Sequence, residues 1–267
     1  MMISNMSLKI NPARRIIKRV SVIVTVFLLS ALISKLYFWE KNYYDTYSQK
    51  QRDIALENVD ERERKEDDKQ NYKVCDTCIR FLSIYKLDID RALVKPVGLT
   101  PTGAMDTLSN IFDVAWYRAS QTPGQGGTSL LNAHNGGPTK TGVFGNLYTL
   151  KEGAVVTLER GDGQIFNYKI TENKIMSVSE ANLYMSTMLQ SPEEGKESVS
   201  LISCAGRYSP SMRTFVDRAM LRGVLIEPGS DEDKKATKKV KDNEKYNSGK
   251  LKKTKKNKNS TKSEKSE

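Results

Sequence analysis

The chain contains the segment Ser198-Val199-Ser200-Leu201-Ile202-Ser203-Cys204, in which small polar residues alternate with apolar ones and a cysteine comes last. This alternation predicts a β-strand that ends at Cys204. A cysteine is a strong nucleophile only as the thiolate, which a nearby imidazolium or guanidinium stabilises. His134 is the single histidine of the chain, and Arg213 opens the next predicted strand. Together these three residues are candidates for covalent acyl-transfer chemistry.

Each of the three residues also has an ordinary structural interpretation. A lone histidine is usually a surface or core residue, but His134 lies where a predicted strand runs into the glycine-rich loop that follows it. Loops held by a rigid scaffold are where catalytic groups gather. Cys204 is equally compatible with a buried structural thiol, and Arg213 with an exposed surface cation. The prediction therefore rests on the joint occurrence of the three residues.

Cys75 and Cys78 form a lone Cys-x-x-Cys pair. A tetrahedral zinc site needs four ligands, and the sequence has no second pair and no spare histidine to supply them. We therefore expect a disulfide between Cys75 and Cys78, with a redox role as the minor alternative and Cys204 as the odd thiol. No spacing of carboxylates indicates a metal site, and we expect neither a metal nor a cofactor.

The positive charge is concentrated at the C-terminal end of the chain. Residues 234–267 carry 14 lysines and four acidic residues, which accounts for nearly all of the net charge of +11. With almost no apolar residues to bury, this tail is predicted to be disordered. It is either a solvated tail or an electrostatic attachment to an anionic polymer or membrane surface. No motif indicates specific nucleic-acid binding.

The N-terminal region has the composition of a membrane anchor. Residues 20–34 carry no charge, and after Lys35 the apolar run continues to Trp39, which gives about the 20 residues that span a bilayer. Basic residues precede the run, so we expect a single-pass protein of the cell membrane, with the N-terminus cytoplasmic and the rest of the chain extracellular. A cleaved signal peptide is the competing interpretation, which the missing small-x-small cleavage site disfavours.

These observations divide the chain into five predicted segments. They are a cytoplasmic basic segment at 1–19, a transmembrane anchor at 20–39, a charged helical stalk at 40–73, a globular domain at 74–227 and a disordered Lys-rich tail at 228–267. A role of the stalk as a lid over the active site has no support in the sequence.

The globular segment is predicted to be mainly β. Many short strands at this spacing favour a closed or nearly closed antiparallel barrel, and Gly161-Asp162-Gly163 indicates a hairpin turn. The predicted strands are 79–84, 154–158, 165–170, 199–203 and 215–226. Short helices are predicted at 108–111 and 179–189.

Residues 80–226 resemble a sortase, a cysteine transpeptidase of Gram-positive cell surfaces. The residues that carry the resemblance are Trp116-Tyr117 with Pro123-Gly124-Gln125-Gly126-Gly127, Ala133-His134, Gly142-Val143-Phe144-Gly145-Asn146-Leu147 with Leu150-Lys151-Glu152-Gly153, Ser200-Leu201-Ile202-Ser203-Cys204, and Arg213 in the place of the essential arginine. Ala133 departs from the usual glycine, and Ser200 and Ser203 depart from two threonines. These departures predict altered loop packing and leave the Cys-His-Arg assignment intact.

The resemblance implies an eight-stranded β-barrel with short helices, preceded by the transmembrane helix and the stalk. It implies cleavage of an LPxTG-like C-terminal sorting signal and transfer of the acyl group to an amine of the cell envelope. Cys204 would form the thioacyl intermediate, His134 would act as general acid and base, and Arg213 would hold the substrate or the oxyanion. The Ala205 N–H and Ser203 would support the oxyanion or the substrate.

The resemblance also implies the partners, which are surface proteins bearing the sorting signal and the acceptor amine. No second apolar span follows the domain, so we expect a subclass other than the pilus-polymerising one, of class D, E or F type. The alternative function is a non-catalytic, membrane-anchored surface protein that binds an anionic wall polymer through its basic tail. An L,D-transpeptidase is disfavoured because the Ser-His-Gly-Cys motif and second histidine of that family are absent.

Overall fold

The computed structural model describes residues 12–55 and 59–263, which fall into two compact units, Met1–Lys50 and Gln51–Glu267. The described residues of the first unit lie in one helix, α1, whose bounds are Pro12–Ala55. Its stretch Arg19–Lys50 is long and apolar enough to cross a membrane, and its side chains are exposed. This helix contains the predicted anchor at 20–39, whereas residues 1–11 of the predicted cytoplasmic segment lie outside the described residues.

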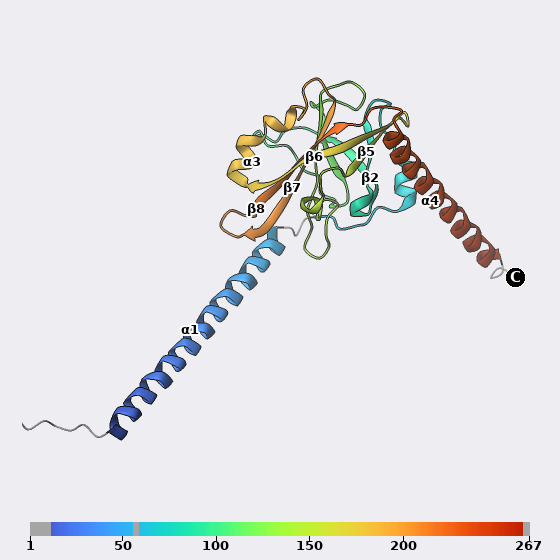
Figure 1. Ribbon diagram of the computed structural model, residues 1–267. Coiled ribbons are helices and arrows are strands. Elements are labelled where there is room, and N and C mark those ends of the chain that lie inside the picture. The colour runs from blue at the N-terminus through green and yellow to red at the C-terminus, as the bar shows by residue number, and fades with distance from the viewer. Residues whose placement is uncertain (1–11, 56–58, 264–267) are drawn as a thin grey trace, which may run out of the picture. The chain divides into compact units, whose positions relative to one another are not determined.

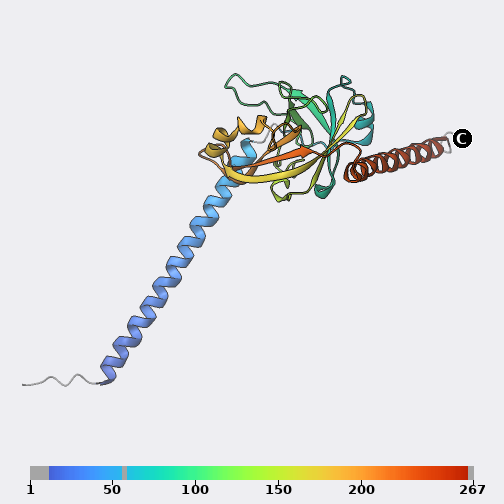
Figure 2. The same cartoon turned by 45° about the horizontal axis from the view of Figure 1, so that its top comes forward.

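The second unit is built on eight strands that close into a barrel, as predicted (Figures 1 and 2). The order around the barrel is β1-β2-β3-β4-β7-β8-β6-β5, and β5 pairs with β1 to close it. The strands are β1 Ile79–Ile84, β2 Ile89–Val97, β3 Val114–Tyr117, β4 Thr128–Asn132, β5 Val155–Arg160, β6 Ile165–Ser177, β7 Ser198–Ser209 and β8 Thr214–Leu225.

Two neighbouring pairs in the barrel are parallel, which corrects the expectation of a purely antiparallel sheet. β2 runs parallel to β3, and β4 runs parallel to β7. Parallel neighbours need a crossover connection rather than a tight hairpin. The β4–β7 pair meets this need because β5, β6 and α3 lie between its strands in the chain. The parallel β4–β7 pair brings the ends of two distant segments to one edge of the sheet.

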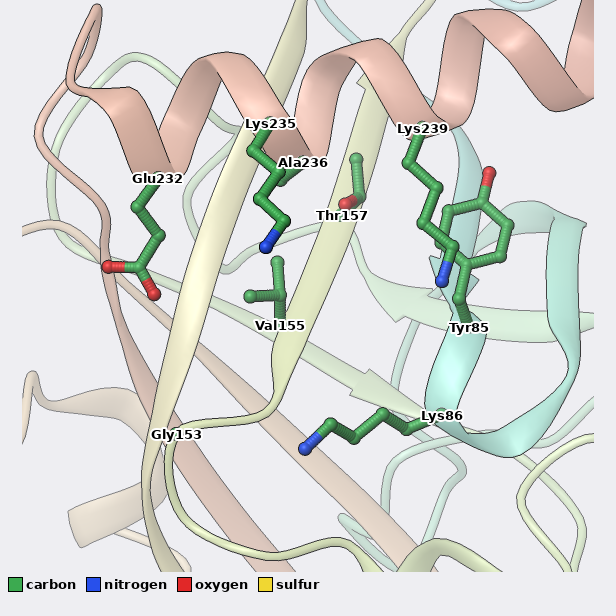
Figure 3. A pocket seen from close by; sticks show the side chains of 9 residues that line it. All are labelled: Tyr85, Lys86, Gly153, Val155, Thr157, Glu232, Lys235, Ala236 and Lys239. Atoms are coloured by element: carbon green, nitrogen blue, oxygen red, sulfur yellow. The ribbon is translucent and has the colours of Figure 1, made fainter.

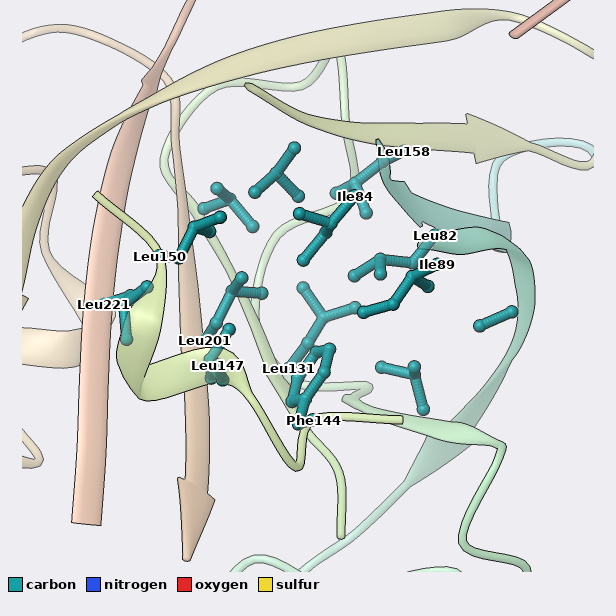
Figure 4. Packing of buried hydrophobic residues seen from close by; sticks show 14 of the residues in the cluster. Leu82, Ile84, Ile89, Leu131, Phe144, Leu147, Leu150, Leu158, Leu201 and Leu221 are labelled. Carbon is teal, nitrogen blue, oxygen red and sulfur yellow. The ribbon is translucent and has the colours of Figure 1, made fainter. Parts of the chain in front are cut away.

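The barrel is filled by apolar side chains from nearly every strand and from the loop after β4. Leu82, Leu131, Leu158 and Leu201 are fully buried strand residues that meet in one cluster (Figure 4). Phe144, Leu147 and Leu150 enter the same cluster from the loop and the short helix η2, Leu147–Thr149. Burying each such side chain stabilises the fold by roughly 1.5–3 kcal/mol. The strands that carry the candidate residues are thus held by a continuous core.

The short helices lie between strands. Helix α3, Val178–Tyr184, begins at Ser177, whose hydroxyl accepts a hydrogen bond from the Glu180 N–H in a capping box. With the following η3, Thr187–Leu189, it accounts for the helix predicted at 179–189. A further short helix, η1, spans Tyr85–Leu87. The helix predicted at 108–111 is wrong, because Asn110 instead pairs with Asp60 in an isolated parallel bridge.

The predicted helical stalk is helical only in part. Helix α1 continues to Ala55, and a second helix, α2, spans Glu66–Asn71, but residues 59–65 between them are not helical. The backbone of this segment pairs with the domain, since the Asp60 N–H donates to Ser109 O at 2.8 Å. Three of its charged side chains, Glu61, Glu63 and Arg64, bind residues of the domain instead of being fully solvated.

The predicted disordered tail also differs from the structure. Residues 231–263 form helix α4, Asp231–Ser263, the dark red helix of Figure 1. Val240 is buried, the Asn167 amide donates to the Asp233 carboxylate at 2.7 Å, and Arg91 pairs with Glu244 at 2.8 Å. These contacts order the first half of the helix against the barrel, which a composition rich in lysine does not predict. Residues 264–267 of the predicted tail lie outside the described residues.

The two cysteines of the Cys-x-x-Cys pair form a disulfide, as predicted. Cys75 and Cys78 lie just before β1, with their Cα atoms 5.1 Å apart, and Cys204 is a free thiol.

Candidate active site

Strands β4 and β7 bring His134 and Cys204 to the same end of the barrel. The two strands are in parallel register up to the pair Asn132 and Ile202. Beyond it, the Ala133 N–H donates to Ile202 O at 3.3 Å, and the Ser203 hydroxyl donates to Ala133 O at 3.1 Å. His134 follows Ala133 in the chain, and Cys204 follows Ser203. The register therefore continues the two chains side by side and delivers both residues to adjacent positions.

Cys204 lies within β7 rather than at its end, which corrects the predicted strand boundary. β7 runs on to Ser209, and its pairing with β8 is interrupted by an irregularity between Ala205 and Tyr208. Gly206 lies inside this irregularity with φ +74°. A left-handed residue and an offset in register are the features of a β-bulge, which changes the direction of neighbouring side chains. The strand is thus distorted immediately after the candidate nucleophile.

Arg218 lies opposite Cys204 across the β7–β8 hairpin. Directly opposed residues in an antiparallel pair have Cβ atoms about 5 Å apart and share one face of the sheet. Burial raises the pKa of the Cys204 thiol, and the positive charge of Arg218 acts in the opposite direction. Arg218 is therefore the cation that favours the thiolate in this structure.

The guanidinium of Arg218 is held by β8 itself. Its Nη1 donates to Asp217 O at 2.8 Å and to Phe215 O at 3.0 Å, and its Nη2 donates to Thr214 Oγ1 at 3.0 Å. No ion pair joins it to a carboxylate among the described residues. A guanidinium fixed by carbonyl and hydroxyl oxygens keeps its full charge available to an anion.

Arg213, the arginine predicted from the sequence, lies in the turn between β7 and β8. It is exposed, has φ +51° and immediately precedes the first residue of β8, Thr214. No hydrogen bond or ion pair involves its side chain in the described part of the chain. The structure thus places His134 and Cys204 at corresponding positions beyond the paired part of β4 and β7, whereas Arg213 lies in the β7–β8 turn, and the role of each residue stays a prediction.

The His134 ring is fixed by a backbone carbonyl. Its Nε2 lies 2.6 Å from Leu108 O, in the loop between β2 and β3. The backbone beyond His134 folds back on itself, since the Phe144 N–H donates to His134 O at 3.1 Å. A Cβ at Gly142 would clash with His134 O, so the return of this loop requires a glycine. His134 is therefore held both at its ring and at its backbone.

A small cavity of about 210 Å³ lies beside His134. It is lined by residues 135–141 of the loop and by Phe215 of β8. The loop after His134 therefore faces the same part of β8 that holds the Arg218 guanidinium. Among the described residues, no cluster of three or more histidine, cysteine or acidic side chains is arranged to hold a metal ion.

The family model of the sortase domain matches residues 82–224, which is more than half of the chain. The chain belongs to the sortase family. Membership implies a cysteine transpeptidase of the cell wall, and the matched region contains all three predicted site residues. Among curated protein sequences, none matches this sortase.

Solved sortase structures resemble this fold at low sequence identity. Pilus-related sortase C of Group B Streptococcus is 18% identical, with a TM-score of 0.44, and the match covers 71% of this chain and 91% of that one. Sortase C1 of Streptococcus suis is 20% identical, with a TM-score of 0.43 and coverages of 58% and 75%. Sortase D5 of Clostridium perfringens is 19% identical, with a TM-score of 0.40 and coverages of 66% and 99%. The subclass of this sortase stays a prediction.

Ser203 and Ala205, the predicted supporting residues, flank the thiol in different ways. The Ser203 side chain is buried and its hydroxyl is used to bind Ala133 O, so it ties β7 to the residue before His134. The methyl of Ala205 is buried in the core, and Ala205 precedes the bulge. Because the Ser203 hydroxyl is bound to Ala133 O next to β4, we expect it to hold the two strands in place and not to bind a substrate. The role of the Ala205 N–H stays a prediction.

Arg218 was missed by the sequence interpretation, although a signal for it exists. Pro210-Ser211 is a turn signal in the sequence. If the hairpin turns at Ser211, then Cys204 and Arg218 are equidistant from the turn and must face each other, as they do. Arg213 is too close to that turn to reach the strand position opposite Cys204.

Proposed function

We propose that this sortase is a membrane-anchored cysteine transpeptidase that cleaves an LPxTG-like sorting signal and joins its acyl part to an amine of the cell envelope. The observation that carries this proposal is the parallel register of β4 and β7, which continues into His134 and Cys204 at one end of the barrel. A nucleophile beside a base is the arrangement that covalent acyl transfer needs.

The reaction proceeds in two acyl transfers. The Cys204 thiolate attacks the carbonyl carbon of the threonine in the signal, and the C–N bond to the glycine breaks as His134 protonates the leaving amine. The product is a thioester on Cys204 and a neutral His134. An acceptor amine then attacks the thioester and gives its proton to His134, the C–S bond breaks, and the thiolate returns.

Arg218 supplies the positive charge of this mechanism in our proposal. It is the strand partner of Cys204, and its guanidinium opposes the effect of burial on the thiol pKa. The same charge would stabilise the oxyanion that forms on the attacked carbonyl, with the Ala205 N–H as a second donor. Arg213 is the competing candidate and differs in lying in the exposed turn.

Apolar side chains near these strands suit the leucine and proline of a sorting signal. Leu183 of α3 is the most exposed of these side chains, at 84%, and Leu189 and Met212 are also exposed. They lie in the segments 177–197 and 205–212, which we propose as the walls of the substrate groove. Helix α1 would anchor the chain in the cell membrane, with the N-terminus cytoplasmic and the barrel outside.

The test is mass spectrometry of the full-length protein after incubation with a peptide carrying an LPxTG-like signal. We expect a mass adduct on Cys204 equal to the acyl part of the peptide, and its loss in Cys204→Ala. The matched control is the double variant Cys75→Ser and Cys78→Ser, which should still form the adduct. Cleavage that persists in Cys204→Ala would refute the nucleophile assignment.

A second candidate function, binding of an anionic polymer, has its own structural support. Helix α4 and the barrel enclose a pocket of about 310 Å³, into which Lys86, Lys235 and Lys239 project (Figure 3). Its one carboxylate, Glu232, is paired with Lys169 at 2.5 Å. The pocket therefore has an excess of positive charge over an apolar wall that includes Val155. Such a site suits a phosphate group of a wall polymer better than a neutral ligand.

This second function is tested by retention on immobilised polyphosphate at increasing salt. Changing Lys86, Lys235 and Lys239 together to Gln should lower the salt needed for elution. The control changes Lys234, Lys238 and Lys241 of α4, which are exposed and outside the pocket, and removes the same charge. Equal weakening by both variants would refute a site in the pocket. If retention on the wall survives Cys204→Ala but not deletion of 234–267, polymer binding is separate from transpeptidation.

A further inference from the structure

Residues 59–65, which we call the strap, come before the barrel in the chain and pair with the loop that holds the His134 ring. The Asp60 N–H donates to Ser109 O at 2.8 Å, and the Ile111 N–H donates back to Asp60 O at 3.0 Å. The Asn110 amide donates to Arg62 O at 2.9 Å. The bonded residues of this loop, 109–111, directly follow Leu108, whose carbonyl oxygen contacts the His134 ring.

The strap also binds the loop that follows His134. The Glu61 carboxylate accepts hydrogen bonds from the Thr139 N–H at 2.8 Å, from the Lys140 N–H at 2.9 Å and from the Thr139 hydroxyl. A Cβ at Gly137 would clash with the Glu61 carboxylate, so the close approach requires a glycine there. Charge-assisted bonds to backbone N–H groups are among the stronger hydrogen bonds in proteins.

A buried ion pair fixes the C-terminal part of the strap. Arg64 makes a bidentate contact with Asp113, at 2.7 and 2.5 Å, and the Asp113 side chain is completely buried. Lys95 of β2 reaches the same carboxylate at 2.6 Å. The strap is thus attached at three points, and two of them are the loop that contacts the His134 ring and the loop that follows His134.

The contact between His134 and Leu108 determines which ring nitrogen carries the proton. A carbonyl oxygen only accepts hydrogen bonds, so the Nε2 that contacts Leu108 O must be protonated. In the neutral imidazole, Nδ1 is then the nitrogen without a proton and the one able to accept one. In catalytic triads a third group orients the base in this way.

We propose that the strap is a positioning element of the active site, which holds Leu108 O against His134 Nε2 and so presents Nδ1 to the thiol and the acceptor amine. This inference rests on the proposed role of His134 as acid and base. The strap lies outside the region that the family model matches, which begins at residue 82. The working enzyme therefore includes a segment that precedes its barrel.

The single histidine of the chain makes the inference directly measurable. With ¹⁵N-labelled histidine in the full-length protein in detergent, long-range ¹H–¹⁵N spectra report the His134 tautomer alone. We expect the Nε2–H tautomer in the neutral ring of the natural protein. In Glu61→Ala, the loops lose the carboxylate that joins them, and we expect a mixture of tautomers and a fall in kcat of roughly tenfold with little change in KM.

Two further variants keep the test decisive. Thr139→Val removes only one hydroxyl donor to Glu61 and should shift the tautomer in the same direction even if Glu61→Ala folds poorly. Glu152→Ala, an exposed glutamate outside the strap and both loops, should leave the spectrum unchanged. An Nδ1–H tautomer in the natural protein, or the natural spectrum in both Glu61→Ala and Thr139→Val, would overturn the inference. Failure of the proposed function would appear separately, as missing acyl adducts on Cys204 with the spectra as expected.

Discussion

Cys204 and Arg218 are opposing residues on β7 and β8, so the thiol and the guanidinium leave the same face of the hairpin. The guanidinium is fixed by oxygens of β8, whereas the thiol is half-buried beside a bulge. Burial favours the neutral thiol and the neighbouring charge favours the thiolate. The reactivity of the enzyme at neutral pH therefore depends on the balance between these two effects.

The first prediction concerns this balance. Because burial raises the pKa of Cys204 and Arg218 lowers it, Arg218→Gln should move the pKa further up. A shift of one pKa unit lowers the thiolate fraction about tenfold at pH values below the pKa. The measurement is the rate of alkylation by iodoacetamide as a function of pH, in a Cys75→Ser, Cys78→Ser background. Arg213→Gln should leave the curve unchanged, and the reverse pattern would assign the role to Arg213.

The second prediction concerns the bulge after the nucleophile. In Gly206→Ala, the added Cβ would clash with the Asp217 carboxylate at a positive φ. We expect a loss of about 1–2 kcal/mol of stability and a larger proportional loss of transpeptidation. Gly103→Ala also has a positive φ but meets no atom, so it isolates the backbone cost. Thermal unfolding and peptide turnover of both variants measure the difference, and identical behaviour would show that the clash is relieved.

The third prediction concerns the buried carboxylate that holds the strap. Asp113→Asn leaves Arg64 and Lys95 without their shared partner, and we expect a loss of about 3–5 kcal/mol. The comparison is Glu193→Gln, which breaks the exposed pair with Lys196 and should cost under about 1 kcal/mol. Urea unfolding measures both. Similar midpoints for the two variants would mean that the strap contributes little to folding.

The fourth prediction concerns the strap in acid. Hydrogen bonds from Thr139 and Lys140 lower the pKa of Glu61 below its ordinary value of 4.5, and the Arg62 side chain lowers that of Asp60. A lowered folded-state pKa gives stability that is complete above the ordinary pKa and is lost as the pH falls through the folded value. The strap should therefore stay bound at neutral pH and begin to detach only once the pH falls below 4.5, the ordinary pKa of Glu61. Hydrogen exchange at the Thr139 and Lys140 amides against pH measures the release, which Glu61→Gln should bring to neutral pH.

The fifth prediction concerns the docking of α4. Val240 is a buried apolar residue of this helix, and Val240→Asp places a charge in the contact with the barrel. We expect faster hydrogen exchange over 231–249 with the barrel amides unchanged. Lys238→Asp, an exposed change on the same helix, is the control. Equal protection in both variants would mean that polar contacts such as Asn167–Asp233 are sufficient.

Strong local patterns in the sequence predicted much of the barrel. The run at β1 and the turn at 161–163 were located correctly because apolar alternation and glycine turns are local properties. The disulfide followed from the spacing of Cys75 and Cys78. The position of His134 just after a strand also followed from a local pattern, whereas the predicted strand end at Cys204 was wrong, because β7 continues to Ser209.

The parts that were missed depend on partners that are distant in the chain. The strap has the composition of a solvated stalk, because nothing near Arg64 indicates that Asp113 will bind it. Lysines dominate the composition of α4, and Val240 is the one buried residue of this helix up to residue 249, so composition indicated disorder where Asn167 and Arg91 supply partners. The pairing of Cys204 with Arg218 depends on the register of one hairpin, which is set by the turn and by the bulge.

The parallel pairing of β4 with β7 has a consequence for the life of the newly made chain. His134 follows the fourth strand in the chain, and Cys204 lies in the last hairpin. During synthesis the base is therefore made before the nucleophile, which follows only when most of the domain has been made. Contacts between such distant segments form late, because closing the long loop between them carries an entropic cost. A chain that lacks the last hairpin thus carries His134 without Cys204, and the two residues come to the same edge only after β7 has joined β4.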